Sequence, residues 1–150
     1  MSRRGKALGR LPIFLTLAAL GGCGAPSPSA TTDAGAPTFG ATALSTTSSD
    51  SGALSLELRT SPQPPIRGTN DAELTILDPS GAPVDGLLIS LVPWMPAMGH
   101  GTSVQPEVSS QGAGHYLIRR LFLIMPGEWE LRLSFTGART DHAIIDVAIP

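Results

Sequence analysis

Apolar and polar residues alternate repeatedly along the C-terminal two-thirds of the chain. Leu54, Leu56 and Leu58 alternate with polar residues, and Trp129 and Phe135 bound a second such stretch. A period of two residues is typical of half-buried β-strands. Similar patterns predict strands at residues 54–59, 73–77, 87–92, 115–124, 128–135 and 145–149. About seven short strands without sustained helical periodicity predict an all-β fold over residues 54–150, an immunoglobulin-like β-sandwich.

Two turns punctuate this pattern. Asp78-Pro79-Ser80-Gly81 has Asp first, Pro second and Gly fourth, the preferences of a type I turn. Met125-Pro126-Gly127-Glu128 fits a type II turn, because glycine takes the positive φ that this turn needs at its third position.

The composition narrows the class of protein. The chain has 150 residues, enough for one domain of ordinary size, and only 15% of them are charged. Seventeen glycines and fourteen prolines disfavour helix-rich and coiled-coil proteins. Cys23 is the only cysteine, which excludes an intrachain disulfide, a thiolate zinc site and an iron–sulfur cluster.

Residues 1–22 have the organisation of a signal peptide. Arg3, Arg4, Lys6 and Arg10 form a positive start, and the apolar run at residues 11–20 is shorter than the roughly 20 residues that span a bilayer. The run ends in Leu-Gly-Gly before Cys23, which resembles the signal of bacterial lipoproteins. This resemblance implies cleavage before Cys23, a diacylglyceryl group on its sulfur, and an acyl chain such as palmitate on the new amine.

We expect this lipid to anchor the mature chain to a membrane on the periplasmic or extracytoplasmic side. The alternative is an ordinary secreted protein with a cysteine near its cleavage site. Gly24, rather than Asp, follows the cysteine, which leaves sorting to the outer membrane open. Residues 24–53 consist almost entirely of Ala, Gly, Pro, Ser and Thr, so residues 23–53 are predicted to be the lipidated cysteine and a disordered linker. An O-glycosylated stalk is the other interpretation of this composition.

Removal of the signal changes the net charge. Four of the ten basic residues and none of the twelve acidic residues lie in the signal, so six bases face twelve acids and the mature chain has a net charge of −6. An acidic chain without a basic patch indicates that nucleic acid is not a partner.

Methionine and histidine cluster in one region. Met95, Met98 and His100 lie on a segment that Pro and Gly keep irregular. His115 begins the next predicted strand, and Met125 lies in the turn that follows it. Thioethers are soft ligands and imidazole is intermediate, so this set suits copper, Cu(I) above all, better than Ca²⁺, Mg²⁺ or Zn²⁺. The alternative is that the methionines fill gaps in the core and His100 bonds a loop carbonyl.

Several segments resemble the YtkA-like/FixH-like domain family of bacterial envelope proteins. They are Pro62 to Asn70, Asp78 to Val84, Met95 to Gly101, Gly114 to Tyr116 and Met125 to Trp129. The resemblance implies a small immunoglobulin-like sandwich associated with copper handling or respiratory-oxidase assembly. It implies Met95, Met98 and His100 as copper ligands, with His115 and Met125 completing the set. A FixH-type protein would have a transmembrane helix, where this chain has a lipid signal.

The remaining motifs separate two hypotheses. The chain lacks the common nucleophile, metalloprotease, P-loop and dinucleotide motifs, so we expect no enzyme. The first hypothesis is a lipid-anchored copper-binding protein that exchanges copper with a donor or acceptor protein of the envelope. The second is a metal-free interaction module that contacts an envelope partner through Trp94 and the Pro-rich loop. His142 is expected to be a solvated loop residue.

Overall fold

The protein is described by a computed structural model that covers residues 35–150, a compact unit. The signal, Cys23 and residues 24–34 lie outside the described residues. The strands are β1 (Ser45–Ser48), β2 (Ser55–Ser61), β3 (Gly68–Leu77), β4 (Leu87–Met95), β5 (His100–Gly101), β6 (Glu107–Gly112), β7 (His115–Leu123), β8 (Gly127–Gly137) and β9 (Asp141–Ile149). A single 3-10 turn, η1 (Pro96–Met98), interrupts them in this part of the chain.

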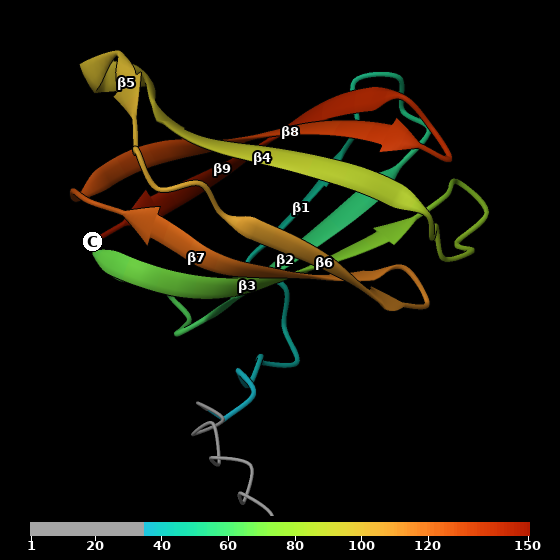
Figure 1. The fold of residues 1–150 in the computed structure, drawn as a ribbon, viewed down its shortest axis with the longest axis horizontal. Coiled ribbons are helices and arrows are strands. Elements are labelled where there is room, and N and C mark those ends of the chain that lie inside the picture. Colours follow the sequence, from blue (N-terminus) through green and yellow to red (C-terminus); the bar gives the residue numbers. More distant parts are fainter. Residues whose placement is uncertain (1–34) are drawn as a thin grey trace, which may run out of the picture. The chain divides into compact units, whose positions relative to one another are not determined.

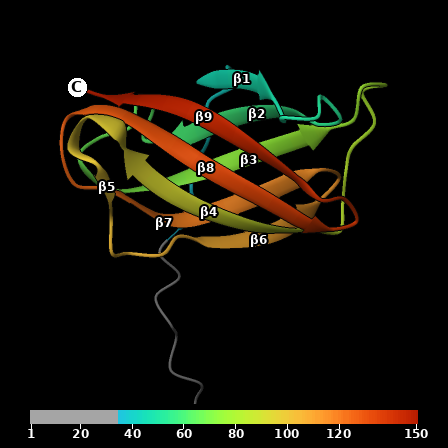
Figure 2. The ribbon, with the colours of Figure 1, turned by 90° about the horizontal axis from the view of Figure 1, so that it is seen from above.

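Two antiparallel sheets stack face to face (Figures 1 and 2). One sheet has five strands in the order β1-β2-β3-β7-β6, and the other has four in the order β5-β4-β8-β9. The predicted all-β class is confirmed. Residues 35–150 form nine strands, where the sequence predicted about seven. The six stretches predicted by residue range correspond to β2, β3, β4, β7, β8 and β9, and β1, β5 and β6 were not anticipated.

Most of the alternating apolar residues face inward, between the sheets. Leu56, Leu58, Leu74 and Ile76 from the five-stranded sheet are fully buried, as are Leu131, Leu133, Ile145 and Val147 from the four-stranded sheet. Trp129 begins the inward face of β8, as its alternation predicted. Its indole nitrogen donates to the carbonyl oxygen of Met125 at 3.0 Å, which satisfies the one polar group of this side chain.

Both predicted turns have the expected chemistry. The Gly81 amide donates to the Asp78 carbonyl at 2.9 Å, which closes the first turn. Gly127 takes a φ of +122°, so the second turn uses the left-handed backbone that only glycine adopts easily.

Tyr116 joins the two sheets at the end opposite the β4–β5 connection. Its buried hydroxyl donates to the Val84 carbonyl at 2.9 Å and accepts from the Leu87 amide at 3.3 Å. The start of β4 is thereby held to β7 of the other sheet.

The ordered domain begins before the expected boundary at residue 54. β1 pairs with β2 from Ser45 to Ser48, and the first backbone hydrogen bond runs from the Leu44 amide to the Leu58 carbonyl at 2.7 Å. The expected linker over residues 23–53 therefore includes a strand. Its Ser and Thr residues bury almost no apolar surface, so backbone pairing rather than a hydrophobic pattern orders them.

Asp141 ties the loop after β1 to the beginning of β9. Its carboxylate accepts from the Ser51 hydroxyl at 2.5 Å and from the Ser51 amide at 3.3 Å, and the Asp50 amide donates to the His142 carbonyl. The hydroxyls of Ser49 and Ser51 hold the pKa of Asp141 well below its usual range. The edge strands β1 and β9 contact one another here and close one side of the sandwich.

Asp141→Asn is expected to lower the midpoint of thermal unfolding at pH 7. Because the folded-state pKa is depressed, the ionised carboxylate stabilises the fold above about pH 4, and this contribution disappears as the pH falls further. The difference between wild type and variant should therefore narrow in acid. Thermal unfolding followed by circular dichroism from pH 3 to pH 7 measures this, with the exposed Asp146→Asn as the control. An equal difference at pH 3 and pH 7 would contradict the assignment.

Candidate functional site

The segment between β4 and β5 is a tight hairpin, which we call the Met/His hairpin and define as residues 95–101. Pro96 opens η1, and Gly99 ends it with a φ of +67°. The Gly99 amide donates to the carbonyls of Met95 at 3.0 Å and Pro96 at 3.2 Å. The chain therefore reverses within five residues, and Met95 becomes the cross-strand partner of His100.

This pairing fixes the relation between the first and last candidate ligands. Residues directly opposite in an antiparallel pair project from the same face, with Cβ atoms about 4.5–5.5 Å apart. Met95 and His100 are such a pair, and Met98 lies on the turn that joins them. The structure thus brings together the three residues that the sequence singled out first.

Met95 is a core residue. Only 6% of its surface is exposed, and its terminal methyl packs against the start of β8, where a Cβ on Gly127 would lie 2.7 Å from it. The absence of a side chain at Gly127 therefore leaves room for Met95. The gap-filling alternative for this methionine is therefore correct as a description of its packing.

Met98 and His100 lie at the surface. Met98 is 56% exposed, and His100 is exposed as well. The His100 ring nitrogen Nδ1 lies 3.1 Å from the Gly101 carbonyl oxygen. A carbonyl only accepts, so Nδ1 is the donor in this contact, and in a neutral imidazole with that tautomer Nε2 carries the lone pair. Neutral histidine ligands in metal sites are commonly oriented by such a bond.

Gly101 is a residue whose role the sequence did not reveal. A Cβ at this position would collide with the Pro93 carbonyl oxygen of the neighbouring strand. Glycine therefore allows β5 to approach β4 closely enough to hold His100 opposite Met95. The only feature of the sequence that pointed to Gly101 was its place in the short stretch Gly-His-Gly.

Met125 lies at the same end of the sandwich. It follows β7 and precedes Gly127, the residue against which Met95 packs. Its side chain is half-buried and packs against the core. Four of the five candidate ligands therefore occur at one end of the domain, where η1 also contacts β8.

His115 lies elsewhere. It begins β7, whereas Met125 follows the end of that strand, and the strand's length of nine residues separates the two by roughly 25 Å. The His115 Nδ1 is 3.3 Å from the Thr75 hydroxyl and 3.7 Å from a Glu73 carboxylate oxygen. The expectation that His115 completes the set is not met, because it faces outward from the five-stranded sheet.

Trp94 and His142 complete the sequence-based candidates. The Arg132 guanidinium lies 4.7 Å from the centroid of the Trp94 ring, and the Glu130 carboxylate accepts from Arg132 at 2.8 and 2.9 Å. Trp94 is consequently half-covered by a cation on the outer face of the four-stranded sheet. His142 is exposed, as expected, but it belongs to β9 rather than to a loop.

Residues 35–150 contain no group of three or more His, Cys, Asp or Glu side chains placed to hold a metal ion. Within the same residues, no helix has the length and hydropathy needed to cross a membrane.

Comparison with known proteins identifies the family. Residues 49–134 match the family described as YtkA-like, which is more than half of the chain. The chain belongs to the YtkA-like family. The match contains the whole Met/His hairpin and Met125, and it ends within β8.

Other comparisons add little to this YtkA-like assignment. A search of curated protein sequences finds no significant match. Among solved structures, the chain is similar to a DUF4426 family protein from Pseudomonas aeruginosa PAO1, with a TM-score of 0.48 and 10% sequence identity. The similarity covers 65% of this chain and 91% of that protein.

The different burial of the two hairpin methionines predicts different effects on stability. Met95→Ala leaves a cavity beneath the hairpin and should lower the free energy of unfolding by about 2–4 kcal/mol. Met98→Ala removes an exposed side chain and should change it by no more than about 0.5 kcal/mol. Urea denaturation measures both. Equal destabilisation by the two substitutions would show that Met98 also packs in the core.

Proposed function

We propose that this YtkA-like protein is a cell-envelope module that binds copper(I) at the Met/His hairpin. The observation that carries the proposal is the contact of His100 Nδ1 with the Gly101 carbonyl, which points to Nε2 as the donor atom, on the same short hairpin as the exposed thioether of Met98. Met95, paired with His100, provides a second sulfur from below. These donors are soft or intermediate, which favours Cu(I) over hard cations.

Both the number and the type of donor atoms at this end of the sandwich suit a Cu(I) ion. His100, Met98 and Met95 come from one hairpin, and Met125 adds a fourth donor at the same end of the sandwich. Met98 and His100 lie at the surface, so an ion has access from solvent. Met95 would reach it by a rotation of its flexible side chain, since it has three rotatable bonds.

Competition with a chromophoric Cu(I) chelator tests the site. Met98→Ala and His100→Ala should each weaken copper binding by about tenfold or more, which corresponds to ~1.4 kcal/mol. Met95→Leu should also weaken it, because leucine preserves the volume of the core but removes the sulfur. Acid should weaken binding by the wild type, because protonated imidazole is not a ligand.

The chain offers matched controls for this experiment. His115→Ala and His142→Ala remove histidines that lie outside the hairpin, and both variants should bind copper like the wild type. If a variant with alanine at Met95, Met98 and His100 competed as well as the wild type, the proposed copper function would be wrong.

The resemblance of residues 1–23 to a lipoprotein signal supports a location in the cell envelope. We propose that a lipid on Cys23 anchors the chain on the extracytoplasmic side of a membrane, where it exchanges copper with a donor or acceptor protein, in copper handling or oxidase assembly. Cys23→Ala should abolish incorporation of a labelled palmitate analogue and release the protein from the membrane fraction. Labelling of the Cys23→Ala variant at the wild-type level would contradict this anchor.

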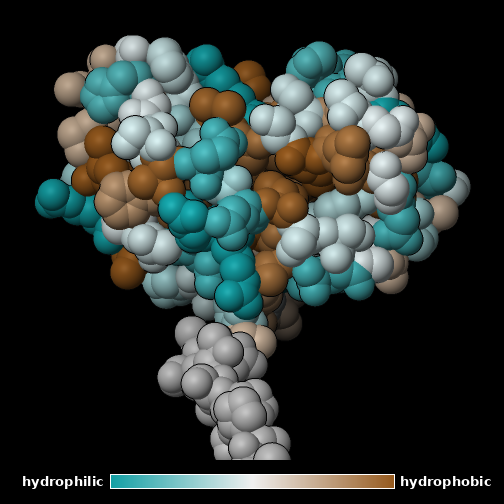
Figure 3. Space-filling view, viewed as in Figure 1, coloured by the Kyte–Doolittle hydropathy of each residue, from teal (hydrophilic) through white to brown (hydrophobic). Residues whose placement is uncertain are grey.

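A second candidate is a metal-free interaction module, with an exposed apolar surface as its support. Leu88, Val92 and Ile144 lie on the outer face of the four-stranded sheet and are each at least 44% exposed. Trp94 lies on the same face, next to Val92 along β4. Figure 3 shows hydrophobic surface in several places between hydrophilic side chains. A pull-down in which Trp94→Ala retained every captured envelope protein would count against this contact surface.

A further inference from the structure

The outer face of the five-stranded sheet carries an apolar side chain among charged ones. Leu117 of β7 faces away from the core and is only half-exposed. Its cross-strand neighbours are Glu73 of β3 and Ser109 of β6. Leu88 and Val92 occupy comparable outward positions on the other sheet and are exposed, so the partial burial of Leu117 indicates a cover from outside the sheet.

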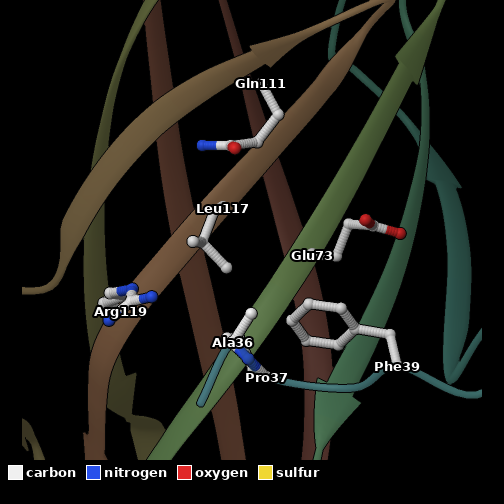
Figure 4. A pocket seen from close by; sticks show the side chains of 7 residues that line it. All are labelled: Ala36, Pro37, Phe39, Glu73, Gln111, Leu117 and Arg119. Carbon is white, nitrogen blue, oxygen red and sulfur yellow. The ribbon is translucent and has the colours of Figure 1, made fainter. Parts of the chain in front are cut away.

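The cover is the chain's own N-terminal segment, residues 36–39, which we call the strap. Pro37 and Phe39 are half-buried, whereas Ala36 and Thr38 are exposed. This alternation indicates an extended segment that presents every second side chain to the sheet. Figure 4 shows the strap on one side of a pocket, with Leu117 behind it on β7.

The pocket between strap and sheet has a volume of about 280 Å³. Its walls come from the strap and from three strands of the sheet. The lining residues are Ala36, Pro37 and Phe39 from the strap, and Glu73, Gln111, Leu117 and Arg119 from the sheet. The strap therefore fills this surface only in part.

Side chains alone hold the strap in place. Within residues 35–150, the first backbone hydrogen bond to the sheet begins at Leu44, and none is formed by residues 35–40. Glu73 already has the Arg59 guanidinium of β2 at 3.7 Å, so its ion-pair partner belongs to the sheet and not to the strap. An apolar contact without a backbone ladder is one that another segment of similar shape can replace.

We propose that this face is a recognition groove for an extended segment with a proline and an aromatic residue two positions apart. The strap of the same chain occupies the groove in the free protein. A segment of a partner protein, with a proline and an aromatic residue at the same spacing, exchanges with the strap. Pro37 reduces the entropy lost on docking, because proline restricts the backbone to extended conformations. Phe39 supplies the apolar contact. This groove is independent of the proposed copper site.

Cleavage by chymotrypsin after Phe39 reports on docking in cis. Leu117→Ser should raise the rate of this cleavage by about tenfold, because proteolysis tracks the population of the released strap. Leu88→Ser, which alters an exposed leucine on the other sheet, is the matched control and should not change the rate. If wild type and Leu117→Ser were cleaved equally fast, or if Leu88→Ser had the same effect, the docked strap would be disproved.

A peptide tests exchange in trans. Phe39→Ser vacates the groove in the intact chain, and this variant should bind a peptide of residues 35–41 at least about fivefold more tightly than the wild type does, because the wild-type strap competes in cis. The control peptide carries serine in place of phenylalanine and should not bind. Chemical-shift changes at Leu117 and Arg119 would locate the contact. Failure of Phe39→Ser to bind the peptide, or equal binding of the control peptide, would overturn the proposal and leave the copper site untouched.

Discussion

Each sheet of this protein has one apolar face, and water is excluded from both faces only when they stack on one another. Leu58 and Leu74 from one sheet, and Leu131 and Ile145 from the other, make this contact and are fully buried. The inward alternation then fixes the register of every central strand, since a slip by one residue would turn its leucines to solvent. The positions of the hairpin and the strap follow from that register, because β4 leads into the hairpin and β7 presents Leu117 and Arg119 to the strap.

The same constraint explains what the sequence could and could not predict about the fold. Strands with one apolar face, such as β8 and β9, show alternating apolar and polar residues in the sequence. The alternating burial of their side chains confirms these strands. By contrast with β9, which is also an edge strand and alternates throughout, β1, β5 and β6 are short edge strands whose sequences hold few apolar residues. Backbone pairing orders them without a hydrophobic pattern, and this is why the domain was expected to begin at residue 54.

The candidate site was predictable where the ligands are close in sequence. Spacing placed Met95, Met98 and His100 together, and the hairpin does so through Pro96 and Gly99. His115 and Met125 flank the same predicted strand, so an extended conformation had to separate them. That separation was readable from the sequence, whereas the pairing of β4 with β5 and the approach of Gly127 to Met95 were not, because both depend on contacts between distant residues.

Packing and chemistry make different demands on the end of the sandwich beneath the hairpin. Packing requires an apolar side chain there, and a binding site for a soft ion requires a donor atom. Leucine or isoleucine would pack there but has no donor atom. Cysteine has a donor atom, but its thiol is open to oxidation. A thioether meets both, because methionine packs as an apolar side chain and its sulfur remains a neutral, soft ligand. Met95, opposite His100, therefore serves the core whether or not an ion is bound, and Gly127, which has no side chain, leaves the space that its terminal methyl fills.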